Sequence, residues 1–215
     1  MSSHSIGIYG GTFNPIHLGH IGAASEVRDY LQLDELRMVL SATPPHRKPP
    51  EVLAENRFLL LQAALQQYPR LIADDCELQR QGPSYMVDTL RAIRQQGAHR
   101  DSSVLLILGA EAFSSFMSWQ HWQDIIKCAH IVITTRAGFS DQLGDSLNDY
   151  IEPYITTDKS QLKQLTHGKI YQLPVSAIDI SATEIRRRLK TNEPVEQMLP
   201  ENTWALIHQH GFYTR

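Results

Sequence analysis

The sequence predicts an open, doubly wound α/β fold, in which a parallel sheet carries helices on both faces. Two observations lead to this fold class: strand and helix patterns alternate along the whole chain, and the strand patterns are almost continuously apolar. Strands of that kind are buried on both faces, as in a parallel sheet covered by helices. Because crossovers between parallel strands are right-handed, an open doubly wound sheet is the simplest arrangement.

Each element is predicted from its local pattern. Residues 6–9 form a short apolar run that ends at Gly10-Gly11, as expected for a buried strand followed by a turn. Residues 84–96 follow Pro83 and begin with Ser84, a suitable N-cap for a helix. In chain order we expect a strand over residues 6–9, a helix over 18–32, a strand over 36–40, a helix over 54–67, a short strand over 71–73, a helix over 84–96, strands over 103–108, 131–134 and 170–173, and helices over 182–190 and about 200–209.

Residues 1–215 are expected to form a single domain, because no repeat, low-complexity segment or composition shift divides the chain. A hydrophobic content of 42% is enough for a core of normal size. Residues from about 138 to 168 are polar and irregular in pattern. We therefore regard this segment as a candidate peripheral insertion.

The net charge and the cysteine content indicate which partners to exclude and which cellular compartment to expect. A net charge of −3 argues against general attraction to nucleic acid or to a membrane surface, so neither is expected as a partner. Cys76 and Cys128 are too few for a disulfide framework and are expected to be buried thiols in a reducing compartment. No apolar run approaches the roughly 18 residues that span a membrane. These features predict a soluble cytoplasmic protein, and they leave its oligomeric state open.

The stretch GGTFNPIHLGH, residues 10–20, follows the first predicted strand. It matches neither the dinucleotide-binding G-x-G-x-x-G pattern nor a Walker loop. Pro15 disfavours helical angles at the residue before it, so the next helix should begin near His17 or Leu18. His17 and His20 would then share one face of its first turn, beside free backbone N–H groups and the positive end of the helix dipole. This arrangement favours phosphate binding, while a zinc site and a purely structural role stay open.

A second stretch, ISATEIR at residues 180–186, has the features of a helix start. Ser181 and Glu184 have the spacing of a capping box. Capping does not explain why Arg186, Arg187 and Arg188 follow so soon, where the helix dipole disfavours cations. A bound polyphosphate would compensate for these charges.

Both stretches resemble motifs of the nucleotidyltransferase superfamily. The first is similar to its G-G-[ST]-F-[DN]-P-x-H-x-G-H signature, and the second to its I-S-[SA]-T-x-I-R element. The resemblance implies a Rossmann-like fold, an ATP site and catalytic roles for His17 and His20, and a further likeness in the middle of the chain adds Arg47 to the catalytic residues. The ATP-binding residues that the two motifs imply are Gly10, Gly11, Thr12, Phe13, His20, Ile180, Ser181, Thr183 and Arg186, and the likeness of the middle of the chain adds Gly109 and Glu111.

The middle of the chain resembles one family within the superfamily, the bacterial nicotinate-nucleotide adenylyltransferases. The segments that carry this likeness are PPHR at residues 44–47, PSYMVDTL at 83–90, LGAE at 108–111 and the region around Trp119. The likeness implies adenylyl transfer from ATP to nicotinate mononucleotide, with Mg²⁺ carried by ATP and coordinated mostly by substrate and water. The mononucleotide-binding residues that it implies are Asn14, His46, Arg47, Tyr85, Met86, Trp119 and Arg136.

Two other functions remain open at this point. The acceptor could instead be nicotinamide mononucleotide or phosphopantetheine, because the distinction between acid and amide depends on donors that the sequence does not place. The chain could also be a nucleotide-sensing module without catalysis. Met86 and Glu111 stand where the resembling family has threonine and aspartate.

Overall fold

The computed structural model describes residues 4–45, 48–135, 145–176 and 179–214. Within them six parallel strands form one sheet in the order β3-β2-β1-β4-β5-β6. The chain builds outward from β1 to one edge of the sheet, then returns to the middle and builds outward to the other edge. The doubly wound prediction is therefore confirmed. The strands are β1 (Ser5–Gly11), β2 (Glu35–Leu40), β3 (Leu71–Asp74), β4 (Ser103–Gly109), β5 (His130–Thr135) and β6 (Ile170–Pro174).

Every predicted strand and helix is present, with ends that differ by a few residues. Four short helices, α4 to α7, were not predicted, because each is too short to show a helical period in the sequence. The helices of the described residues are α1 (Leu18–Leu31), α2 (Ala54–Leu65), α3 (Met86–Gln95), α4 (Ala110–Ser114), α5 (Trp122–Cys128), α6 (Asp145–Ile151), α7 (Gln161–Gln164), α8 (Ala182–Lys190) and α9 (Glu201–His210).

The predicted N-cap of α3 was wrong. Tyr85, not Ser84, precedes the first helical residue, and no side chain caps this end. The hydroxyl of Ser84 instead accepts a hydrogen bond from the N–H of Thr43, at 3.0 Å. Ser84 therefore joins the start of α3 to the loop that follows β2.

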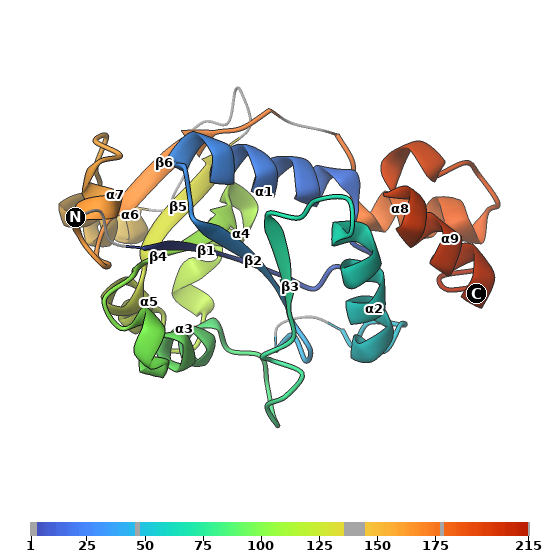
Figure 1. The fold of residues 1–215 in the computed structure, drawn as a ribbon, viewed down its shortest axis with the longest axis horizontal. Helices are drawn as coiled ribbons and strands as arrows, with labels where there is room; N and C mark the ends of the chain where they lie inside the picture. Colours follow the sequence, from blue (N-terminus) through green and yellow to red (C-terminus); the bar gives the residue numbers. More distant parts are fainter. Residues whose placement is uncertain (1–3, 46–47, 136–144, 177–178, 215) are drawn as a thin grey trace.

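Helices cover both faces of the sheet and enclose two hydrophobic cores. In Figure 1, α1 lies across one face, α3 and α5 lie across the other, and α8 and α9 lie together away from the N-terminus. Alternate residues of a strand enter opposite cores: Met38 packs with the core that includes α1 and α2, and Val39 with the core that includes α3 and α5. This two-sided burial explains why the strands are apolar at almost every position.

Residues 145–168, the described part of the candidate insertion, pack against the rest of the molecule. Leu147, Ile151 and Leu162 are buried in the two cores. The N–H of Val104, in β4, donates to the carbonyl of Thr166 at 3.1 Å. These contacts support one domain, which stays a prediction.

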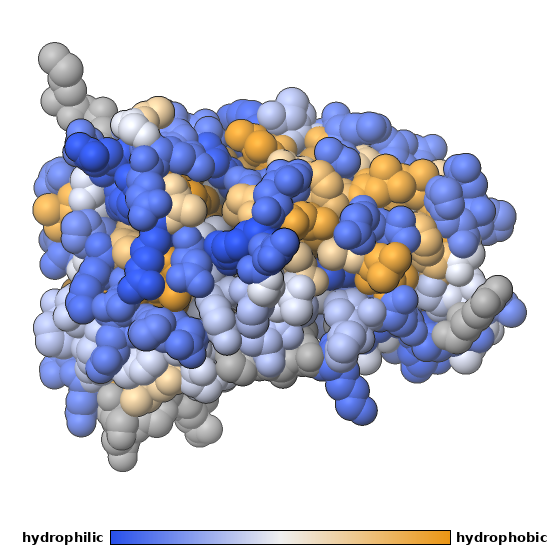
Figure 2. All heavy atoms as spheres, turned by 90° about the horizontal axis from the view of Figure 1, so that it is seen from below, coloured by the Kyte–Doolittle hydropathy of each residue, from blue (hydrophilic) through white to orange (hydrophobic). Residues whose placement is uncertain are grey.

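The surface mixes apolar and polar side chains. Figure 2 shows hydrophobic patches on one face of the molecule, separated by hydrophilic residues. Among the described residues, the exposed large hydrophobic side chains include Leu53, Leu59 and Ile72. No helix in the described part of the chain is long and apolar enough to cross a membrane.

Candidate active site

The carboxyl ends of β1 and β4 form the topological switch point of the sheet. These two strands are neighbours, and the chain leaves β1 toward β2 and leaves β4 toward β5, in opposite directions across the sheet. Ligands of doubly wound folds bind in the crevice that such a divergence creates. The GGTFNPIHLGH stretch begins at the end of β1 and therefore lies at this crevice.

His17 and His20 stand at the start of α1, as predicted. His17 is the N-cap residue, in an extended conformation, and the helix begins at Leu18. The N–H of His20 donates to the carbonyl of His17 at 3.0 Å. The two imidazole rings stack with their centroids 3.7 Å apart and their planes at 27°. The helix start therefore presents the two rings as one unit.

Both histidines are held neutral by their surroundings. Burial lowers the pKa of His17 to about 4. Burial, followed by the proximity of His17, lowers the pKa of His20 well below its ordinary value. The Nδ1 atoms of both rings are buried and have no hydrogen-bond partner among the described residues. At neutral pH the pair is therefore uncharged, and each ring has a buried nitrogen without a partner among the described residues.

Gly19 brings the two sequence motifs into contact. A Cβ atom at this position would lie 3.0 Å from His17 Nδ1 and 3.5 Å from the carbonyl oxygen of Ile180. The absence of a side chain thus lets the His17 ring and the Ile180 carbonyl, which lies just before the N-cap of α8, pack closely against α1. This contact explains on steric grounds why a glycine stands between the two histidines.

Arg186 connects α8 to the first motif. Its Nη1 donates to the carbonyl of Asn14 at 2.7 Å, and its Nη2 donates to Thr183 Oγ1 at 3.3 Å. Ser181 caps the helix, because its Oγ accepts from the N–H of Glu184 at 3.2 Å. The second half of the predicted capping box is not formed: the Glu184 carboxylate binds arginines instead.

The interpretation of the three consecutive arginines needs correction. Arg187 pairs with Glu184 and Glu193, and Arg188 pairs with Glu184. Both arginines lie in the last turn of the nine-residue helix, where the dipole favours cations. A bound polyphosphate is therefore not needed to explain them, and only Arg186 reaches the first motif.

The loop between β1 and α1 has an unusual backbone conformation, and a side chain from α2 forms a hydrogen bond to it. Phe13 is 2% exposed and has φ of 44°, in the left-handed region that few non-glycine residues adopt. Its ring packs edge-on against the His20 ring, with centroids 5.2 Å apart. The Asn14–Pro15 peptide bond is cis. The carbonyl of Thr12 accepts a hydrogen bond from Arg57, on α2.

Arg57 was not among the predicted site residues, although the sequence carries a signal for it. It lies three and four residues before Leu60 and Leu61, on the apolar side of α2, and is only 1% exposed. A cation on the buried stripe of an amphipathic helix requires hydrogen-bond partners inside the protein. The helical spacing of Arg57 from two leucines is therefore the pattern that indicates its role.

Proteins with similar sequences and folds point to one family. The cytidylyltransferase-like family matches residues 8–188. A protein of Methylococcus capsulatus named "Probable nicotinate-nucleotide adenylyltransferase" is 40% identical, over 98% of this chain and 100% of its own length. One from Hydrogenovibrio crunogenus with the same name is 39% identical, over 97% of each chain. The chain belongs to the nicotinate-nucleotide adenylyltransferase family.

The same family appears among solved structures. The Plasmodium falciparum nicotinic acid mononucleotide adenylyltransferase complexed with NaAD superposes with a TM-score of 0.71, at 18% identity over 97% of each chain. A complex of the same name with APC has a TM-score of 0.67. At these identities the structures support the fold. Membership makes the chain a nucleotidyltransferase, an enzyme of a kind that generally uses a divalent metal with ATP.

In this adenylyltransferase, the structure gathers three of the expected acceptor-binding residues on one side of the sheet. Tyr85, Met86 and Trp119 are partly buried and pack against the core beneath α3 and α5. Met86 also approaches the first motif, because a Cβ at Gly10 would lie 2.6 Å from its Cε. The indole of Trp119 packs against Phe116, with ring centroids 5.8 Å apart.

The remaining expected residues of the adenylyltransferase divide into two groups. Gly109 ends β4, and a Cβ there would meet no atom within 4 Å, so the crevice is open beside it. Glu111 follows in the first turn of α4 and is exposed. His46, Arg47 and Arg136 lie outside the described residues, and their expected roles stay predictions.

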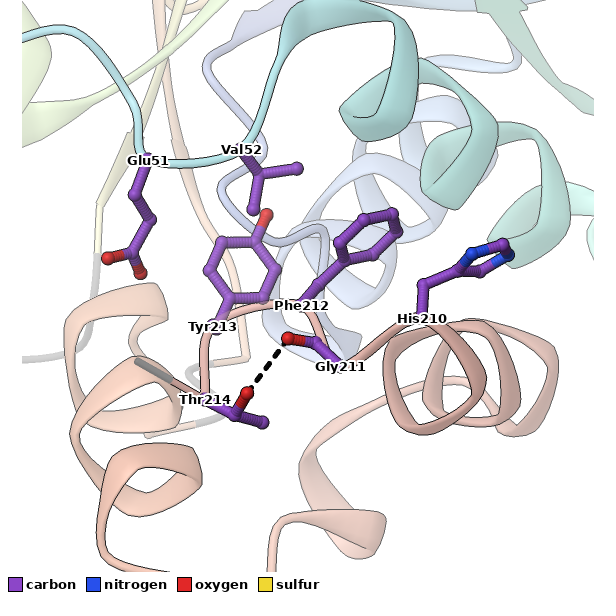
Figure 3. A pocket seen from close by; sticks show the side chains of 7 residues that line it. All are labelled: Glu51, Val52, His210, Gly211, Phe212, Tyr213 and Thr214. Carbon is purple, nitrogen blue, oxygen red and sulfur yellow. Dashed lines mark hydrogen bonds between the residues drawn. The ribbon is translucent and has the colours of Figure 1, made fainter.

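One measurable cavity of the adenylyltransferase lies away from these motifs. It has a volume of about 430 Å³ and lies between residues 51–52 and the C-terminal residues 210–214. Figure 3 shows the Tyr213 ring on its wall, with the hydroxyl toward Val52. None of the residues that line it belongs to either motif. The cavity is therefore separate from the candidate site at the switch point.

Proposed function

We propose that this chain transfers the adenylyl group of ATP to nicotinate mononucleotide, giving nicotinate adenine dinucleotide and pyrophosphate, a step of NAD biosynthesis. Relatives of that name are 39–40% identical to this chain over nearly its full length, which supports the reaction. The observation that carries the location is the contact of the two motifs at the switch point, through Gly19 and through Arg186 with Asn14. One domain spanning residues 1–215 is proposed to contain the whole site.

The proposed chemistry is an in-line displacement at phosphorus. A phosphate oxygen of the mononucleotide forms a bond to the ATP α-phosphorus as the bond to pyrophosphate breaks, and the pyrophosphate oxygens take the electron pair. No covalent intermediate with the chain is required, so positioning and charge stabilisation are the contributions of the protein. Neutral His17 and His20 donate hydrogen bonds to phosphate oxygens near the reacting centre.

The ATP side of the site combines both motifs. The backbone of residues 10–13 and the ring of His20 lie against the phosphates, and the open end of β4, with Gly109 and Glu111, receives the nucleoside. Ser181, Thr183 and Arg186 hold the β- and γ-phosphates at the start of α8, where backbone N–H groups and the helix dipole favour an anion. Arg186 exchanges the Asn14 carbonyl for a phosphate oxygen, a stronger charge-assisted acceptor.

The acceptor side uses the residues around the start of α3. The backbone at Tyr85 and Met86 faces the pyridine carboxylate, and the Trp119 indole stacks with the flat pyridine ring. Asn14 stands between the two substrates, and its buried Oδ1 has no partner among the described residues. The resemblance alone assigns the phosphate end to His46 and Arg47, and assistance with the pyridine to Arg136.

Mg²⁺ is the metal that we propose to accompany ATP. In the described part of the chain, no three His, Cys, Asp or Glu side chains gather at one point. The site residues fit an ion that arrives on the phosphates, because Mg²⁺ keeps several waters and commonly binds through substrate oxygens. When bound, it supplies neutralisation of the phosphate charge.

Pyrophosphate release tests the proposal. Purified protein with ATP and Mg²⁺ is offered nicotinate mononucleotide, nicotinamide mononucleotide or phosphopantetheine in separate reactions, with a reaction lacking Mg²⁺ as the control. We expect release to depend on Mg²⁺ and to be strongest with the nicotinate form. Release with another acceptor alone would overturn the roles given to Tyr85, Trp119 and Arg136. No release with any acceptor would contradict catalysis and favour a nucleotide-sensing role.

A further inference from the structure

Arg57 is a buried cation whose hydrogen bonds all go to backbone carbonyls. Its Nε donates to Val52 at 3.2 Å, its Nη1 to Thr12 and to Ser41, and its Nη2 to Ala42, the last two at 2.9 Å. Burying a guanidinium is costly unless its donors are satisfied. Because every one of these hydrogen bonds goes to a carbonyl of a loop, the side chain has a role in the geometry of those loops.

The carbonyls that Arg57 binds belong to the two loops at the edges of the proposed site. Thr12 follows the end of β1, in the first motif, and Ser41 and Ala42 follow the end of β2, before PPHR. Both strands are parallel neighbours, so their carboxyl ends leave the sheet side by side. One planar group therefore bridges the ATP-side loop and the acceptor-side loop.

The bridge continues to the start of α3. The N–H of Thr43 donates to Ser84 Oγ at 3.0 Å, and the N–H of Ser84 donates to the carbonyl of Thr43 at 3.0 Å. In a planar trans peptide the carbonyl and the N–H point in opposite directions. Holding the Ala42 carbonyl thus directs the Thr43 N–H toward Ser84, the residue before Tyr85.

We infer that Arg57 is a positioning residue, which sets the separation between the ATP-side loop and the acceptor-side loop and, through Thr43 and Ser84, the start of α3. This inference rests on the proposed function for the assignment of the two sides. Arg57 touches neither substrate and acts only through the backbone. Arginine suits the task, because its planar fork offers five donors, whereas a lysine offers three on a single atom.

Arg94 provides a matched control at the amino ends of the strands, whereas the proposed site lies at their carboxyl ends. It also donates to several carbonyls, including those of Cys128 at 2.8 Å and Ser102 at 2.6 Å. These residues lie just before β5 and β4, at the amino ends of the strands, far from the proposed site. Loss of Arg94 should therefore cost stability without moving the two loops.

The test compares Arg57→Lys and Arg57→Met with Arg94→Lys and Arg94→Met. For each variant, kcat and KM for both substrates are measured on folded protein, together with the melting temperature. Because misplacement by about 1 Å can lower the rate about 100-fold, we expect kcat/KM to fall about 10-fold in Arg57→Lys and about 100-fold in Arg57→Met. The Arg94 variants should keep kcat within about 2-fold of the parent at a similar loss of melting temperature.

Amide hydrogen exchange supplies a readout that does not depend on activity. In Arg57→Lys, the N–H groups of Thr43 and Ser84, which are hydrogen-bonded between the loop and the start of α3, should exchange faster than in the parent, while those of β4 and β5 stay unchanged. Unchanged exchange at both amides, or an equal fall of kcat in Arg94→Lys, would overturn the inference. A parent protein without transfer activity would instead contradict the proposed function, and exchange alone would then decide the role of Arg57. If Arg57→Met does not fold, Arg57→Lys carries the test.

Discussion

Three residues at the start of α1, His17, Gly19 and His20, determine how closely the two motifs pack together. The His17 and His20 rings stack because the N-cap position turns the first ring over the first helical turn. Gly19 leaves no side chain against the first ring. Burial removes the positive charge from both rings. At this scale the site is an uncharged pair at the positive end of a helix, which suits an anionic ligand.

A methyl group at Gly19 tests this packing. In Gly19→Ala the new Cβ would lie 3.0 Å from His17 Nδ1, closer than nearly all real contacts, and the buried ring has little room to move. We expect pyrophosphate release to fall about 10-fold or more through displacement of the ring, with the fold retained. Steady-state kinetics and circular dichroism are the measurements.

Gly97→Ala is the control for this substitution, because a Cβ at Gly97 meets no atom within 4 Å. It should leave both the rate and the spectrum as in the parent. Equal rates in the two variants would show that the close contact at Gly19 has no catalytic consequence.

At the scale of a single element, the residues of α8 have distinct structural roles. It starts at Ser181, a true side-chain cap, and presents Arg186 to the Asn14 carbonyl. Its next two arginines turn to Glu184 and Glu193 on the solvent side. The helix therefore separates one arginine that contacts the first motif from two that pair with carboxylates on the helix surface.

This division predicts different kinetics for neighbouring substitutions. Arg186→Gln removes the cation beside the first motif, so the KM for ATP should rise about 10-fold or more, with a smaller change in the KM for the mononucleotide. Arg187→Gln removes only exposed ion pairs, and such pairs contribute little. Its kinetics should match the parent. The idea fails if Arg187→Gln raises the KM for ATP as much as Arg186→Gln does.

At the scale of the whole molecule, burial of neutral histidines makes stability depend on pH. Besides the pair in the site, His130 in β5 is fully buried, and burial lowers its pKa to about 4. Its Nδ1 accepts from the N–H of Lys169, so Nε2 carries the proton and donates to the carbonyl of Leu165. Between pH 4 and 6.5 the unfolded chain binds more protons at these rings than the folded chain does, so stability rises with pH there.

His130→Gln isolates one of these contributions. The free energy of unfolding of the parent should fall as the pH drops from 6.5 to 4, and His130 should account for roughly 3 kcal/mol of that fall. The variant should show a correspondingly shallower slope, measured by urea unfolding at several pH values. Gln209→Ala, at an exposed position and without a titratable group, serves as the control and should keep the parent slope. Parallel slopes in all three proteins would contradict a buried neutral His130.

The sequence by itself determined the sheet, the long helices and the two motifs, because near-continuous apolar runs and helical periods are local patterns that tertiary contacts reinforce. It also placed the start of α1, since a proline restricts the residue before it. Only the tertiary structure decided which polar groups meet. The pairing of Arg187 with Glu193, the use of Ser84 by Thr43 and the four carbonyls around Arg57 depend on distances between segments that no local pattern encodes. Burial also belongs to the tertiary structure, because the low pKa of His17 and His20 comes from the environment that the folded chain builds around them.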